Sequence, residues 1–113
     1  MRLPHRNLSL AFALFAAAST RVSCALAAPA PVAVEITKFA YTPADLVVEP
    51  GATVTWTNRD ETPHTVTSAD GALASPALDT GDHWQRRFDA EGDYVYTCTL
   101  HPFMMGTVHV RRH

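Results

Sequence analysis

Apolar and polar residues alternate with a period of two along much of this chain, and this alternation restricts the fold more than any other feature. Val54 and Trp56, for example, alternate with threonines over residues 53–57. Such alternation predicts β-strands with one buried face, and no stretch after residue 27 shows the 3.6-residue period of a helix. We predict strands over six segments: residues 32–37, 45–49, 53–57, 83–89, 94–98 and 106–111.

Turn-forming residues separate these segments. Pro50-Gly51 is a strong turn signal, residues 58–63 form a polar loop before a further extended stretch at residues 64–67, and residues 68–82 have no sustained period and predict a long connection. About seven to eight short strands separated by turns are typical of a Greek-key β-sandwich or barrel. We therefore expect one all-β domain.

The N-terminal segment has the composition of an export signal. Three basic or titratable residues open the chain: Arg2, His5 and Arg6. Residues 8–18 are apolar, and residues 25–27 form an Ala-Leu-Ala cleavage motif. We expect residues 1–27 to be a cleaved secretory signal peptide and residues 28–113 to be a single periplasmic domain that does not insert into the membrane.

Two alternatives to simple cleavage are an uncleaved membrane anchor and a lipoprotein modified at Cys24. The apolar run is shorter than the roughly 20 residues that span a bilayer. Arg21 interrupts any longer apolar run, and it lies three residues before Cys24, where a lipoprotein signal has an aliphatic residue. Both alternatives are therefore disfavoured.

The charge of the mature chain excludes one class of partner and draws attention to one thiol. Cleavage would leave 6 lysine and arginine residues against 11 acidic ones and change the formal charge from −2 to −5. Nucleic-acid-binding proteins carry basic stripes, so we expect no nucleic-acid partner. Cys98 would be the only cysteine left, and an unpaired thiol in an oxidising compartment needs a reason, of which metal binding is one.

Residues 98–104 place a thiol, an imidazole and a thioether at intervals of three, in Cys98, His101 and Met104. A single inward-facing cysteine is more often a small core residue, but this spacing is not typical of a core. A thiolate and two imidazoles with a weak axial methionine suit copper. His64 is the best candidate for the second imidazole, because it follows a turn-rich loop and begins an extended segment.

Two stretches carry a resemblance to a known family. One runs Trp-Thr-Asn-Arg over residues 56–59 and leads to Pro63-His64, and the other runs Tyr-Val-Tyr-Thr-Cys-Thr-Leu-His-Pro-Phe-Met over residues 94–104. With these stretches the chain resembles the cupredoxins, the blue-copper family, and within them the amicyanin branch. The resemblance implies a cupredoxin-like fold with one type 1 copper ion that cycles between Cu(II) and Cu(I).

The same resemblance implies a ligand set. His64, Cys98 and His101 would be the equatorial copper ligands and Met104 the axial one. The neighbouring Met105 is the alternative axial ligand, and the spacing favours Met104.

The resemblance also implies contacts around the ligands. Asn58 is expected to hydrogen-bond Thr99, and the backbone amide of Thr65 to donate to the Cys98 sulfur. Thr65 stands where the family usually has asparagine, and we expect this change to remove a side-chain contact.

Four ligands leave no open position for a substrate, so we predict a soluble, monomeric electron carrier rather than an enzyme. Pro102, Phe103 and Met105 are expected to form an apolar patch around His101 that docks redox partners transiently. The resemblance implies an amine dehydrogenase as donor and a c-type cytochrome as acceptor. The alternative is a periplasmic copper-binding carrier or sensor without electron transfer, although the chain lacks a Met-rich run. A catalytic Cys-His pair is disfavoured because no third orienting residue is identifiable.

Overall fold

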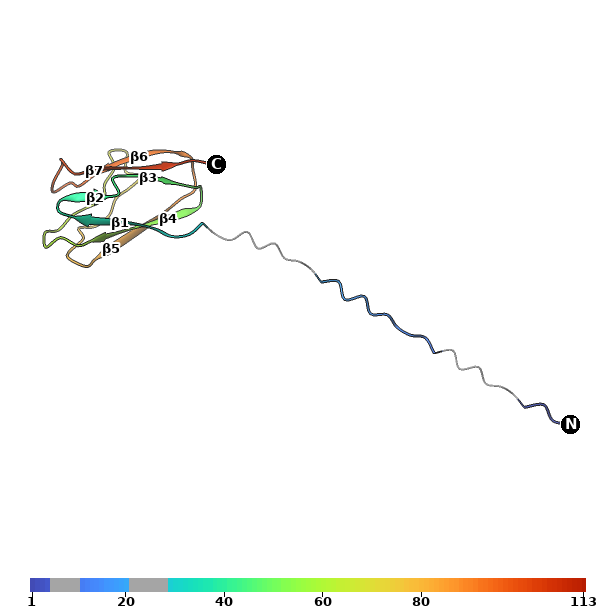
Figure 1. Ribbon diagram of the computed structural model, residues 1–113. Helices are drawn as coiled ribbons and strands as arrows, with labels where there is room; N and C mark the ends of the chain where they lie inside the picture. The colour runs from blue at the N-terminus through green and yellow to red at the C-terminus, as the bar shows by residue number, and fades with distance from the viewer. Residues whose placement is uncertain (5–10, 21–28) are drawn as a thin grey trace.

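The computed structural model describes residues 1–4, 11–20 and 29–113 of the chain (Figure 1). Parts of the predicted signal peptide lie outside these described residues, namely His5, Arg6, the start of the apolar run, Cys24 and the cleavage motif at residues 25–27. Within the described ranges, no helix is long and apolar enough to cross a membrane.

Seven β-strands form between residues 29 and 113. They are β1 (Val32–Thr37), β2 (Ala40–Thr42), β3 (Asp45–Val48), β4 (Ala52–Asn58), β5 (His83–Phe88), β6 (Gly92–Thr97) and β7 (Met105–Val110). All six strands predicted from the alternation are present, with ends that shift by one or two residues. The prediction of an all-β domain is confirmed.

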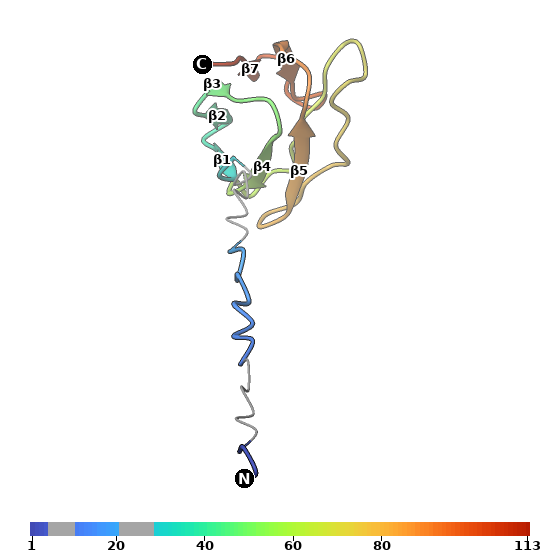
Figure 2. The same cartoon turned by 90° about the vertical axis from the view of Figure 1, so that its right-hand side faces the viewer.

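The strands form two sheets, which Figures 1 and 2 show as two layers. One sheet has the order β2-β1-β4-β5 and the other the order β3-β7-β6. β1 pairs with β4 and β3 pairs with β7 in parallel, whereas the other neighbours are antiparallel. Parallel neighbours cannot be joined by a hairpin, so the chain passes to the other sheet between them. The two sheets face each other and share one core.

Side chains from both sheets fill this core in the predicted period of two. Val54 and Trp56 of β4 are fully buried, as are Val108 and Tyr96 of the opposite sheet. Each fully buried large apolar side chain stabilises the fold by about 1.5–3 kcal/mol. The core therefore holds the two layers in register, and with them the loops at the ends of the strands.

Two side chains, Arg86 of β5 and Tyr94 of β6, make contacts that explain their positions. Arg86 lies on the half-buried face of β5 with Trp84 and Phe88, and its guanidinium packs 4.5 Å from the centre of the Phe88 ring. Such a cation–π contact keeps the charge near the surface while the stem is covered. The Tyr94 hydroxyl donates to the Ala90 carbonyl at 2.8 Å, a tyrosine corner that holds the start of β6.

The sequence prediction missed strand β2, treating residues 41–43 as an interruption. β1 and β2 form a hairpin whose two-residue loop is Lys38-Phe39, since Thr37 pairs with Ala40. Both loop residues have positive φ, 52° and 54°, as a type I′ turn requires. That turn usually contains Asn or Gly, so the sequence carried no signal for it.

Gly106 explains how β6 and β7 approach each other beside the cysteine. It lies opposite Tyr96, and a Cβ atom at this position would collide with the Tyr96 ring. The missing side chain therefore lets the Tyr96 ring lie flat over β7 and point into the core. Cys98 lies two residues further along, on the same face of the chain, and is also fully buried.

Candidate metal centre

Three of the four predicted ligands come together at one end of the sandwich. Nδ1 of His64 lies 3.8 Å from the Cys98 sulfur, and Nδ1 of His101 lies 3.7 Å from it. The three donor atoms all lie within 4.8 Å of one another, and no other such group occurs among the described residues. Two imidazole nitrogens and one thiol sulfur are a set that fits copper.

His64 belongs to the segment of residues 60–67, hereafter the histidine segment. The backbone amide and carbonyl of His64 form two hydrogen bonds with those of Leu78, at 3.1 and 2.8 Å. Thr67 forms a second such pair with Thr97 of β6, at 3.0 and 2.8 Å. The segment is thus bonded to the long connection on one side and to β6 on the other. His64 is fully buried as a result.

Asp60 determines which nitrogen of His64 faces the cysteine. Its carboxylate lies 2.8 Å from Nε2 of His64, which leaves Nδ1 directed at Cys98. The same carboxylate accepts hydrogen bonds from the backbone amides of Lys38 at 2.7 Å and Phe39 at 2.9 Å. Burial raises the pKa of Asp60, but these hydrogen bonds outweigh it, so the pKa lies below its usual value and the group is ionised at neutral pH.

Thr65 ties the histidine segment to the cysteine. Its backbone amide donates to the Cys98 sulfur at 3.3 Å, as the resemblance implied. Its hydroxyl oxygen accepts from the Thr99 backbone amide at 2.9 Å and lies 3.0 Å from the Thr99 hydroxyl. The expectation that threonine at this position loses a side-chain contact is therefore wrong, because its hydroxyl reaches across to the residue after the cysteine.

The expectation for Asn58 is wrong as well. Its amide nitrogen donates to the carbonyls of Thr62 at 2.9 Å and Leu78 at 2.8 Å, not to Thr99. Its side-chain oxygen accepts from the Asp60 amide at 2.9 Å. Asn58 thus shapes the loop that presents Asp60 and His64, while Thr65 makes the link to Thr99.

Residues 98–104, hereafter the cysteine loop, are closed by their own backbone. The His101 amide donates to the Cys98 carbonyl at 3.2 Å, and the Met104 amide donates to the His101 carbonyl at 2.9 Å. Met104 is 2% exposed, whereas Met105 opens β7 and is 59% exposed. Burial thus separates two adjacent methionines that the sequence left as alternatives.

Phe39 is a neighbour of the site that sequence reasoning missed. Its ring lies edge-on to both imidazoles, with centroid distances of 5.3 Å to His64 and 5.1 Å to His101. It comes from the β1–β2 turn, 25 residues from one histidine and 62 from the other in sequence. No spacing rule joins such positions, and an aromatic residue in a turn was the one available hint.

Two buried tyrosines lie behind the site. The Tyr41 hydroxyl donates to the Thr65 carbonyl, and burial, with the nearby Cys98 adding to it, raises the pKa of Tyr41 well above its usual value. Burial likewise raises the pKa of Tyr96 to about 12. Both side chains are therefore neutral, so the wall behind the cysteine carries no charge of its own.

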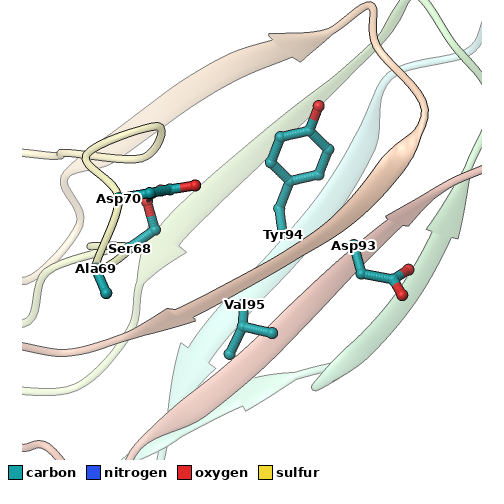
Figure 3. A pocket seen from close by; sticks show the side chains of 6 residues that line it. All are labelled: Ser68, Ala69, Asp70, Asp93, Tyr94 and Val95. Atoms are coloured by element: carbon teal, nitrogen blue, oxygen red, sulfur yellow. Dashed lines mark hydrogen bonds between the residues drawn. The ribbon is translucent and has the colours of Figure 1, made fainter.

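A surface cavity lies away from these three donors. It measures about 240 Å³ and is lined by Ser68, Ala69, Asp70, Asp93, Tyr94 and Val95, which Figure 3 shows. Its two carboxylates are already engaged, Asp70 by the Ser68 hydroxyl and Asp93 by His109. None of the three donor residues lines it, so the metal centre has no adjoining substrate pocket there.

Comparison with known proteins gives a consistent result. The family model described as copper binding proteins of the plastocyanin/azurin family matches residues 28–111. Amicyanin of Paracoccus denitrificans is 39% identical over 82 residues, which are 68% of this chain and 63% of that protein. Amicyanin-alpha of Methylorubrum extorquens is 35% identical, with 66% of this chain and 67% of that protein covered.

A third relative is the methylamine utilization protein MauL of Methylophilus methylotrophus, 35% identical over 57% of this chain and 40% of that protein. The chain thus spans less than two thirds of the first of these relatives.

Solved structures support the same relationship. The amicyanin of Paracoccus versutus superposes with a TM-score of 0.68 and 31% identity over 72% of this chain and 81% of that one. A purple cupredoxin from Nitrosopumilus maritimus superposes with a TM-score of 0.64 and 35% identity. The match covers 71% of this chain and 99% of that one. A copper nitrite reductase from Thermus scotoductus superposes with a TM-score of 0.70 and 28% identity, but only 23% of that chain is covered.

Proposed function

Because the chain belongs to the plastocyanin/azurin family of copper binding proteins, and its cofactor is accordingly one type 1 copper ion, we propose that it is a blue-copper electron carrier. The observation that carries the proposal is the convergence of three donors of unequal exposure. His64 and Cys98 are fully buried, whereas His101 is half-buried. Such a site shields the metal from solvent on one side and leaves a single ligand at the surface.

The proposed equatorial ligands are Nδ1 of His64, the Cys98 sulfur and Nδ1 of His101, and the proposed axial ligand is Met104. The distances of 3.8 and 3.7 Å from the two nitrogens to the sulfur support the first three. Burial supports Met104 over Met105. All four donors come from one chain, which supports a functional monomer.

The bound copper supplies a one-electron Cu(II)/Cu(I) couple. The protein's part is to keep its donors still while the charge changes. The Asp60 carboxylate holds His64, the Thr65 amide donates to the Cys98 sulfur, and the Thr65 hydroxyl holds the Thr99 amide. Such outer contacts orient the ligands and tune the metal.

His101 is the proposed point of electron entry and exit. Exposed apolar side chains lie near it in the chain or in space: Phe39 (42% exposed), Leu100 (53%), Phe103 (73%) and Met105 (59%). An exposed apolar patch of this kind marks a docking site. A small interface, below about 1,200 Å² in total, would let partners associate and leave quickly.

The relatives suggest the partners. Two are amicyanins, and a third is named for methylamine utilization. We propose that an amine dehydrogenase donates electrons to this chain and that a c-type cytochrome accepts them. We further propose that residues 1–27 direct export to the periplasm and are removed, which leaves residues 28–113 as the working domain.

Spectroscopy and kinetics test the carrier function together. The copper-loaded protein should show an intense visible sulfur-to-copper band with a narrow copper hyperfine splitting, and Cys98→Ser should abolish both. Stopped-flow mixing of the reduced, Cu(I) protein with an oxidised c-type cytochrome should restore the band as the cytochrome becomes reduced. A colourless Cu(II) complex whose copper exchanges readily with a chelator would contradict the proposal and indicate a copper carrier or sensor instead.

A further inference from the structure

We propose that Asp60 is a positioning residue for both imidazoles of the metal centre. Its carboxylate holds His64 directly and holds His101 through the ring of Phe39. The inference rests on the proposed function only in treating the two imidazoles as copper ligands. The coupling itself is a property of the protein chain and is measurable without metal.

The Asp60 carboxylate has three donors and uses both oxygens. Oδ1 accepts from the Lys38 amide at 2.7 Å, and Oδ2 accepts from the Phe39 amide at 2.9 Å and lies 2.8 Å from Nε2 of His64. The side chain is 13% exposed, so water competes little for these contacts. Hydrogen bonds to an ionised group are stronger than those between neutral groups, so this carboxylate constrains both the β1–β2 turn and the His64 ring.

The β1–β2 turn needs that constraint. Lys38 and Phe39 both have positive φ, a conformation that residues other than Gly, Asn and Asp rarely adopt. A bulky residue in this conformation is strained and persists only when its surroundings hold it there. The two backbone amides bound by Asp60 are those of the two strained residues, so the carboxylate offsets the strain and selects this turn.

The β1–β2 turn places the Phe39 ring against both imidazoles. The ring is nearly perpendicular to His64, at 88°, and to His101, at 83°. Edge-to-face pairs at such centroid distances are favourable beyond the burial of their area. Because His101 is half-buried and no carboxylate among the described residues binds it, this contact restricts the rotation of its ring. A shift of the turn therefore shifts the imidazole through which electrons are proposed to pass.

Resonances of the histidine ring protons report this coupling. We would compare the full chain, metal-free and loaded with Cu(I), with the variants Asp60→Asn and Phe39→Leu and with the double variant. Asparagine keeps the shape of aspartate but has one acceptor oxygen, so it cannot satisfy all three donors. Asp70→Asn is the matched control, since Asp70 also accepts a side-chain and a backbone hydrogen bond in a turn and loses the same charge.

The expected result has three parts. Asp60→Asn displaces the ring resonances of both His64 and His101, although Asp60 touches only the first, and Asp70→Asn displaces neither. Phe39→Leu displaces those of His101. In the Phe39→Leu background, Asp60→Asn still displaces His64 but displaces His101 less than in the parent, because only the direct contact of the two imidazoles, with a centroid distance of 4.9 Å, then remains.

Two results would overturn the proposal. A change at His64 with none at His101 in Asp60→Asn would limit the carboxylate to its own imidazole. An equal effect of Asp60→Asn on His101 with leucine at position 39 would exclude the route through Phe39. The metal-free measurement separates this test from the proposed function, since it stands whether or not the protein carries electrons.

If Asp60→Asn does not fold, a second variant and a second measurement still test the proposal. Asp60→Glu keeps the charge and lengthens the side chain by one methylene, and it should displace both histidines in the metal-free protein. Copper affinity, measured by competition with a chelator, should fall roughly 10- to 100-fold in Asp60→Asn and remain unchanged in Asp70→Asn. Unchanged affinity together with unmoved His101 resonances in Asp60→Glu would reject the positioning role.

Discussion

The histidine segment and the cysteine loop deliver ligands to the same point but are built differently. The histidine segment is bonded to several other parts of the molecule, among them the β1–β2 turn through Asp60, Leu78 through His64, and β6 through Thr67. The cysteine loop is closed mainly by backbone bonds within itself, and its outer side chains at Leu100 and Phe103 are exposed.

This difference separates two tasks. An electron carrier must hold its metal nearly still, and it must also bring the metal close to a partner. The buried segment serves the first task because the scaffold fixes it from several sides. The short exposed loop serves the second, and Thr65 links the two by binding both the Cys98 sulfur and the Thr99 amide.

The largest contrast should appear when each histidine is removed from the metal-free protein. His64→Ala should lower the free energy of unfolding by about 4 kcal/mol, since it leaves a cavity and takes a hydrogen-bond partner from Asp60. His101→Ala should lower it by less than about 1 kcal/mol, because its ring is half exposed. Urea unfolding measures both, and equal losses would show that the two segments do not differ as described.

The two adjacent methionines give the next contrast. Met104→Ala should cost about 3 kcal/mol in unfolding free energy, as for other buried methionines, and should alter the visible spectrum of the copper-loaded protein. Met105→Ala should remain within about 0.5 kcal/mol of the parent with an unchanged spectrum. A spectrum that changes only in Met105→Ala would make Met105 the axial ligand.

Removing the link between the two segments should have a smaller effect. Thr65→Val keeps the side-chain shape but removes the hydroxyl that binds the Thr99 amide, so the unfolding free energy should fall by about 1 kcal/mol. Thr65→Ser keeps the hydroxyl and serves as the control, and the Thr99 amide should exchange with solvent faster only in the valine variant. Unchanged exchange there would mean that the link does not constrain the cysteine loop.

The smallest effect on stability should come from the exposed rim of the cysteine loop. Phe103→Ser should change the unfolding free energy by no more than about 0.5 kcal/mol while slowing electron exchange with a redox partner. Val47→Ser removes an apolar side chain that is 61% exposed on β3 and should leave the exchange rate unchanged. Equal slowing in both variants would remove the assignment of the rim as the docking surface.

The strands that build the core were predictable from the order of the residues. Val54 and Trp56 alternate with polar neighbours, and a strand sends successive side chains to opposite faces, so the buried face follows from the pattern alone. β2 was missed because its turn contains Lys38 and Phe39 in place of Asn or Gly. A hydrogen-bond acceptor 21 or 22 residues away, Asp60, stabilises that turn, and no local pattern contains this information.

The roles of Asn58 and Thr65 show the limit of arguing from a resemblance. From position alone, Asn58 was expected to hydrogen-bond Thr99, and Thr65 was expected to lose a side-chain contact. The path of the loop decides otherwise, because it directs the Asn58 amide to Thr62 and Leu78 and brings the Thr65 hydroxyl to Thr99. Side-chain partners in loops depend on backbone geometry to within a few tenths of an ångström.

The sequence by itself determined the sandwich class and the spacing of Cys98, His101 and Met104, since a period of two and a short contiguous loop are local properties. Only the tertiary structure decided that His64 faces the cysteine through Nδ1, that Met104 rather than Met105 is buried, and that Asp60 and Phe39 surround both imidazoles. Those relations join residues that lie far apart in the chain, and they arise when two sheets close around one core and bring their end loops together.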